Sequence, residues 1–172
     1  MKRRISRSSV CVALLSLLVL VAGCGEPAPT EVQLRPDGLR VGSVVQAVIS
    51  PIAYGGGTYS RLIGPEGGTL YFGAGSLTFP RGAVGGSTLI TATVDGVTLG
   101  VDFGPEGIAF PFQARPVLKL NSFSITDSNT TSIVYVDDQN RILSVLPTTV
   151  DLSSRTALAY LDHFSPYILA QN

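Results

Sequence analysis

The segment from Ile133 to Val145 reads Ile-Val-Tyr-Val, then Asp-Asp-Gln-Asn, then Arg-Ile-Leu-Ser-Val. Two short apolar runs, rich in β-branched and aromatic residues, flank four residues that favour turns. This pattern predicts an antiparallel hairpin whose loop, residues 137–140, is built around a type I turn. A hairpin is the unit of an antiparallel sheet, so this segment indicates the fold class of the chain around it.

Asp137 and Asp138 in this loop also raise the question of a Ca²⁺ site. A hard cation takes roughly six to eight oxygen ligands, and no third acidic residue lies close to this pair in the sequence. We therefore interpret both aspartates as turn residues. We expect no metal site and no cofactor.

The alternation of short apolar runs and turn residues continues on both sides of the hairpin. Gly, Pro, Asn and Asp separate the runs, and no longer stretch shows the apolar period of about 3.6 residues that marks an amphipathic helix. We predict an all-β domain, an antiparallel β-sandwich, over residues 41–172. The expected strands are Gly42–Ile49, Tyr59–Ile63, Thr69–Phe72, Ser76–Phe79, Leu89–Val94, Thr98–Phe103, Pro116–Asn121, Thr131–Val136, Ile142–Leu146 and Ala157–Ala170.

Three glycine-rich segments, at residues 55–57, 64–68 and 73–75, resemble phosphate-binding loops at first sight. No predicted helix follows any of them, so none has the helix N-terminus that binds a phosphate group. We interpret them as turns and bulges between strands.

The N-terminus carries the features of an export signal. An apolar run from Val10 to Val21 is shorter than the roughly 20 apolar residues that span a bilayer, and glycines and prolines follow it closely. We therefore predict a cleaved signal peptide over residues 1–23 rather than a transmembrane helix. Four cations precede the apolar run: Lys2, Arg3, Arg4 and Arg7.

The apolar run closes on Val21-Ala22-Gly23-Cys24, which resembles the lipobox of bacterial lipoproteins. The resemblance implies that Cys24 is lipidated and becomes the mature N-terminus. Two or more acyl chains, palmitate among them, would hold the protein firmly on a membrane. We expect residues 24–40 to form the lipidated N-terminus and a flexible tether in the cell envelope. The membrane is the outer one if the host has two.

The charge of the mature chain excludes one class of partner. Removal of the four cations of the signal peptide leaves eight Lys and Arg against twelve Asp and Glu, a net charge of −4. Lys119 is the only lysine that remains, and no cluster of arginines replaces the lost cations, so we exclude nucleic acid. Cys11 leaves with the signal peptide and Cys24 is acylated, so no intrachain disulfide is expected.

Five blocks with prolines, glycines or aromatic residues at characteristic positions occur in a recognisable order. They are Ile63–Thr69, Leu77–Ala83, Phe103–Phe110, Pro116–Leu120 and His163–Tyr167. Their order resembles the ZU-five domain, named for the zonula occludens proteins and the Unc-five netrin receptors, here in a bacterial lipoprotein. The resemblance implies a β-sandwich that serves as an interaction module. It does not identify the protein partner.

The last block contains the one candidate for chemistry. In some ZU-five domains a His-Phe-Ser tripeptide cleaves itself, which implies that the Ser165 hydroxyl attacks the Phe164 carbonyl while His163 acts as the base. The structural alternative places His163 and Ser165 on one face of the last strand, with Phe164 and Tyr167 covering the core. We favour the structural alternative because Pro166 changes the backbone where strain would be stored.

Turnover of an external substrate is not expected. His163 is the only histidine, Lys119 has no evident nucleophilic partner and no free cysteine remains, so the chain assembles neither a catalytic triad nor a zinc site. We expect a non-enzymatic interaction or structural module. A second alternative is a cell-wall or carbohydrate-binding domain. Its stacking platform would be Tyr54, Tyr59 and Tyr71, since the chain has no tryptophan.

Overall fold

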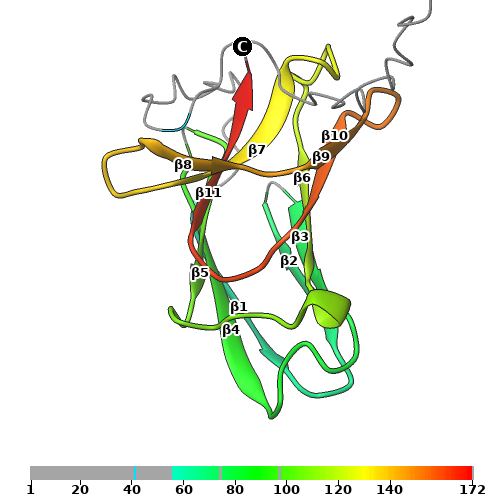
Figure 1. Ribbon diagram of the computed structural model, residues 1–172, viewed down its shortest axis with the longest axis vertical. Helices are drawn as coiled ribbons and strands as arrows, with labels where there is room; N and C mark the ends of the chain where they lie inside the picture. The colour runs from blue at the N-terminus through cyan, green and yellow to red at the C-terminus, as the bar shows by residue number, and fades with distance from the viewer. Residues whose placement is uncertain (1–40, 42–55, 74, 97, 172) are drawn as a thin grey trace, which may run out of the picture. The chain divides into compact units, whose positions relative to one another are not determined.

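The computed structural model describes residues 41, 56–73, 75–96 and 98–171. In these residues two antiparallel sheets pack against each other, which confirms the predicted all-β sandwich (Figure 1). The six-stranded sheet has the order β1-β4-β5-β11-β7-β8 and the five-stranded sheet the order β2-β3-β6-β10-β9. Both sheets belong to the unit Leu34–Asn172, and the unit Met1–Gln33 lies outside the described residues. The elements are β1 Gly57–Ile63, β2 Gly68–Phe72, β3 Gly75–Phe79, β4 Thr88–Val94, β5 Gly100–Gly104, the 3₁₀ helix η1 Phe112–Ala114, β6 Val117–Asn121, β7 Thr131–Val136, β8 Ile142–Val145, β9 Thr148–Asp151, β10 Thr156–Tyr160 and β11 Pro166–Gln171.

The core lies between the two sheets and follows from the alternation of side chains along each strand. Leu70, Leu77, Leu118 and Ala159 face one another across β2, β3, β6 and β10, and all four are buried. They belong to the same buried cluster as Phe103 of the six-stranded sheet. Because a register slip of one residue would turn this row toward water, the row fixes the register of the strands.

The six-stranded sheet is apolar on both faces around β7 and β11. Ile133 and Leu169 belong to the main core, whereas their chain neighbours Val134 and Ile168 belong to a second, smaller buried cluster. Val134 lies opposite Ile168 in the β7–β11 ladder. Successive side chains of a strand point to opposite faces, so the second cluster lies on the face away from the main core.

The hairpin of β7 and β8 forms as predicted, with its loop at residues 137–140. The backbone N–H of Asn140 donates to the carbonyl oxygen of Asp137 at 2.9 Å, which closes the turn. The Asp137 carboxylate accepts hydrogen bonds from the backbone of Gln139 and Arg141 and from the Arg141 side chain. These bonds, led by the one from the Arg141 backbone, lower the pKa of Asp137. Asp137 is therefore a turn residue, as interpreted.

The predicted strand Ala157–Ala170 is wrong. It is two strands, β10 and β11, which lie in different sheets and are joined by residues 161–165. Leu161, Phe164 and Tyr167 all point into the main core. These residues are three positions apart. In a single strand every second side chain points to the same face, so one strand could not direct all three into the core.

Most other strand predictions agree with the structure within two residues at either end. The short strand β9 was not predicted; it follows Pro147 and, among the described strands, pairs only with β10, at the edge of its sheet. The predicted strand Gly42–Ile49, the signal peptide and the tether lie outside the described residues. Among the residues that the structure describes, no helix has the length and hydropathy needed to cross a bilayer.

Candidate functional site

The connection between β10 and β11 carries the His-Phe-Ser tripeptide from one sheet to the other (Figure 1). The segment from Ile108 to Phe110 holds it in place. The backbone N–H of Phe110 donates to the Asp162 carbonyl at 2.8 Å, and the N–H of Phe164 donates to the Ile108 carbonyl at 3.1 Å. A single β-bridge joins Ala109 to His163. The tripeptide is thus fixed by backbone hydrogen bonds although it lies outside the strands.

Phe164 is the central ring of the aromatic core. Its side chain is 4% exposed. Its ring centroid lies 5.0 Å from that of Phe110, 5.6 Å from that of Phe103 and 6.2 Å from that of Phe79. Phe103 is on β5 and Phe79 on β3, so one residue of the connection binds the two sheets together. The prediction that Phe164 and Tyr167 cover the core is confirmed.

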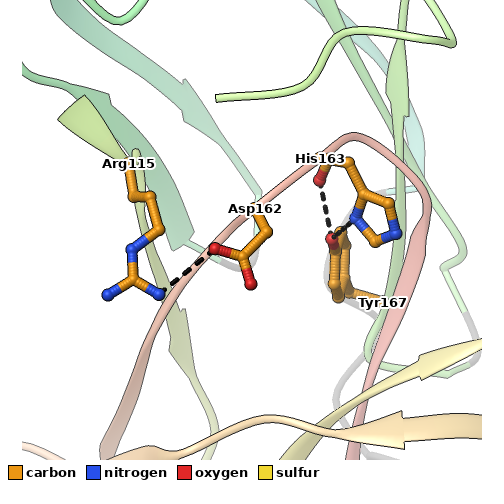
Figure 2. Close-up of polar contacts among 4 residues, drawn as sticks. All are labelled: Arg115, Asp162, His163 and Tyr167. Atoms are coloured by element: carbon orange, nitrogen blue, oxygen red, sulfur yellow. Dashed lines mark hydrogen bonds and ion pairs between the residues drawn. The ribbon is translucent and has the colours of Figure 1, made fainter. Parts of the chain in front are cut away.

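The imidazole of His163 is hydrogen-bonded to the hydroxyl of Tyr167, as Figure 2 shows. The Tyr167 hydroxyl donates its hydrogen to the His163 carbonyl oxygen at 2.7 Å. Its oxygen is then the acceptor for His163 Nδ1, 3.2 Å away, which assigns the imidazole proton to Nδ1. The ring of Tyr135 packs against the imidazole of His163 in a T-shaped arrangement, with the two ring centroids 5.0 Å apart.

The hydroxyl of Ser165 donates to the carbonyl oxygen of Phe164 at 2.6 Å. The hydroxyl thus lies beside the peptide bond that self-cleavage would break. The hydrogen of the Ser165 hydroxyl points to that carbonyl oxygen. Nδ1 of His163 is hydrogen-bonded to the Tyr167 hydroxyl and not to Ser165. The expectation that His163 and Ser165 share a face of the last strand is wrong, because both precede β11. The arrangement favours a structural role for the tripeptide.

We expect the purified mature chain to give a single full-length mass under denaturing conditions. The reason is that the Ser165 hydroxyl donates its hydrogen to the Phe164 carbonyl oxygen and not to the imidazole of His163. Ser165→Ala is the matched control and should give the same pattern. Two fragments that break between Phe164 and Ser165, present in the wild type and absent in the variant, would instead establish self-cleavage.

Alkaline pH should destabilise the domain through Tyr167. Burial raises the pKa of Tyr167 above its ordinary value of 10.0, and the charge of Asp162 adds to the rise. Above about pH 10 the unfolded chain releases the phenol proton while the folded chain keeps it, so the free energy of unfolding falls as pH rises. Tyr167→Phe should flatten this fall in urea unfolding experiments from about pH 8 to about pH 11. An unchanged slope would assign the loss to another group.

A second part of the site lies where η1 meets β10, on the outer face of the five-stranded sheet. Phe112 is 75% exposed and Tyr160 is 58% exposed. The guanidinium carbon of Arg115 lies 4.4 Å from the centre of the Phe112 ring and 5.2 Å from that of Tyr160. The guanidinium is therefore held by cation–π contacts with two exposed rings.

Arg115 also links these two exposed rings to the tripeptide. Its Nη1 lies 3.2 Å from Oδ1 of Asp162, the residue before His163. Figure 2 shows Asp162 and His163 next to each other on the connection, Asp162 paired with Arg115 and His163 with Tyr167. The Nε of Arg115 is buried without a hydrogen-bond partner among the described residues. A pocket of about 570 Å³ opens here, lined by Thr78, Pro80, Phe112, Gln113, Arg115, Val117 and Tyr160.

The structure does not bring the predicted tyrosines together. Tyr54 and the predicted lipidation site Cys24 lie outside the described residues. Tyr59, on β1 of the six-stranded sheet, packs against the core, whereas Tyr71 is exposed on β2 of the other sheet. Sequence reasoning missed the Phe112, Arg115 and Tyr160 cluster. The one sign in the sequence was Phe112 beside Pro111 in a segment with no strand pattern.

No protein-family model and no curated protein matches this chain. The ZU-five resemblance therefore stays a hypothesis that rests on the five sequence blocks.

Proposed function

We propose that the protein is a lipid-anchored β-sandwich of the cell envelope that acts by binding a partner and not by turnover. The observation that carries the proposal is the surface formed by Phe112, Arg115 and Tyr160, which we call the aromatic surface. It combines two exposed rings with a guanidinium at the mouth of a pocket.

The two rings of the aromatic surface are not part of the aromatic core. Five phenylalanines in the core, Phe72, Phe79, Phe103, Phe110 and Phe164, are at most 7% exposed. The fold thus has a full aromatic core without Phe112 and Tyr160. Aromatic and arginine side chains carry much of the binding energy in protein interfaces, because they desolvate a large area with little loss of conformational freedom. Exposed rings around a fixed guanidinium are therefore suited to binding.

The predicted lipid on Cys24 would restrict where this surface works. Residues 24–40 span at most about 3.3 Å each when extended. The tether therefore keeps the domain close to the membrane, and the partner is a component of the envelope. The resemblance to interaction modules of the ZU-five type supports a binding role and does not identify the partner.

The first experiment tests the anchor on the full chain expressed in a bacterial host. The wild type is expected to incorporate a labelled fatty acid, and Cys24→Ser is expected to incorporate none, because the acyl acceptor is lost. Labelling of both proteins, or of neither, would contradict a lipid on Cys24.

The second experiment tests binding. Detergent-solubilised wild-type protein is expected to be retained by envelope material from which lipids have been extracted. A Phe112→Ala and Tyr160→Ala double variant is expected to pass through, since it keeps the lipid but lacks both exposed rings. Equal behaviour of the two proteins would contradict the proposal. Thermal melting of the double variant checks that it is folded.

A further inference from the structure

We propose that the pocket of the aromatic surface binds a neutral carbohydrate. The inference rests on the proposed function and names the ligand class of that surface. It depends on three observations: the pairing of the charges, the exposure of the rings, and the polar groups around them.

The charges at the pocket are balanced. Arg115 is the only charged residue among those that line it, and its guanidinium is paired with Asp162. The Arg115 side chain is 24% exposed, and the Asp162 side chain, which is not part of the pocket lining but is paired with Arg115 beside it, is 73% exposed. A guanidinium only donates hydrogen bonds and a carboxylate only accepts them. The ligand must therefore offer donors and acceptors side by side without net charge, which is the property of adjacent hydroxyl groups.

The rings supply the apolar half of the recognition. The guanidinium of Arg115 covers part of Phe112, yet the residue keeps three-quarters of its surface open to solvent. A sugar ring presents C–H groups on one face and hydroxyl groups at its rim. It can therefore stack on an aromatic face while its rim meets the polar groups next to that face. Tyr160 adds a second ring whose hydroxyl both donates and accepts.

The remaining lining suits the same ligand. Thr78 and Gln113 are neutral, and each can donate and accept hydrogen bonds. The pocket volume of about 570 Å³ is in the range of small-molecule sites, roughly 300–1,000 Å³. The pocket thus joins exposed rings, neutral polar groups and a neutralised ion pair.

Two other ligand classes fit the pocket less well. An anionic ligand would bind the guanidinium only against the repulsion of the Asp162 carboxylate, 3.2 Å away. A proline-rich peptide in the extended polyproline conformation also docks on aromatic grooves, but it has few N–H groups to donate to Asp162. A polyhydroxylated neutral ligand satisfies both partners of the pair.

The test uses the full mature chain in detergent and a panel of neutral oligosaccharides made of glucose, xylose or N-acetylglucosamine units, with binding followed by calorimetry. We expect saturable binding of at least one of them. Phe112→Ala and Tyr160→Ala should each weaken it about tenfold, which corresponds to roughly 1.4 kcal/mol. Arg115→Lys should also weaken it, because the ammonium lacks the planar fork of the guanidinium.

Phe123→Ala is the matched control. Phe123 is 59% exposed and lies under the guanidinium of Arg155, 5.5 Å from the ring centre, but it follows the other end of β6 and does not line the pocket. Its removal should leave oligosaccharide binding unchanged. An equal loss in this variant would overturn the assignment of the pocket.

The outcomes separate the inference from the proposed function. If no neutral oligosaccharide binds while envelope material still retains the protein through Phe112 and Tyr160, the carbohydrate inference is wrong and the binding function stands. Binding of a proline-rich peptide that depends on the same two rings would also overturn the carbohydrate inference. If envelope retention itself does not depend on the rings, the proposed function fails.

Discussion

Phe164→Ala is expected to lower the free energy of unfolding by about 3–5 kcal/mol, which is the cost of removing a buried phenylalanine ring. The residue is almost fully buried and contacts three other phenylalanine rings, one of them from each sheet and one from the segment before η1. The cavity would open at the point where the two sheets meet. Urea unfolding followed by circular dichroism measures the change.

Phe123→Ala is the control for this prediction, since it removes the same number of atoms from an exposed position. It should change the free energy of unfolding by less than about 0.5 kcal/mol. A loss below about 1 kcal/mol for Phe164→Ala would show that the connection between β10 and β11 is not part of the cooperative core.

Gly67→Ala is expected to be the most damaging of the glycine substitutions in the turn between β1 and β2. Gly67 has a φ of +83°, and a Cβ at this position would lie 2.3 Å from the carbonyl oxygen of Phe79. The left-handed backbone costs roughly 1–2 kcal/mol for a residue with a Cβ. The clash adds roughly 1–3 kcal/mol because it is with backbone atoms. A fall in stability of about 2–5 kcal/mol should therefore appear in thermal or urea unfolding.

Gly82→Ala separates the two contributions. Gly82 has a φ of +80°, almost the same as Gly67, but a Cβ added to it would meet no atom of the described residues within 4 Å. Its substitution should cost only the backbone part, roughly 1–2 kcal/mol. If both variants lose the same free energy of unfolding, the close approach of Gly67 to the Phe79 carbonyl does not contribute to the loss.

The fold could be predicted because most strands are short apolar runs bounded by turn residues, a pattern that is visible in the local sequence. The hairpin around residues 137–140 has turn residues between apolar runs, and its loop formed where expected. The prediction failed between β10 and β11 because the connection carries two core residues, Leu161 and Phe164, and its apolar residues continue those of the two strands in sequence. The run from Val134 to Val136 also lacks strict alternation, because both faces of its sheet are apolar there.

The candidate site could be predicted only in part. The His-Phe-Ser tripeptide was visible as a motif, but its hydrogen bonds depend on Tyr167 and on residues 108–110. The aromatic surface was not visible. Arg115 and Asp162 are 47 residues apart in the chain, and only the order of strands in the sheets places η1 beside the end of β10. Sequence periodicity carries no information on such long-range neighbours.

The position of β11 has a consequence for the order in which the domain can form. β11 follows every other described strand in the chain, yet it pairs with β5 on one side and β7 on the other. Before it is made, the described strands β1-β4-β5 and β7-β8 are separate pieces with no ladder between them. The sheet can close only after synthesis has reached β11, and such distant pairings fold slowly. The six-stranded sheet thus remains in two parts until the last described strand has been made.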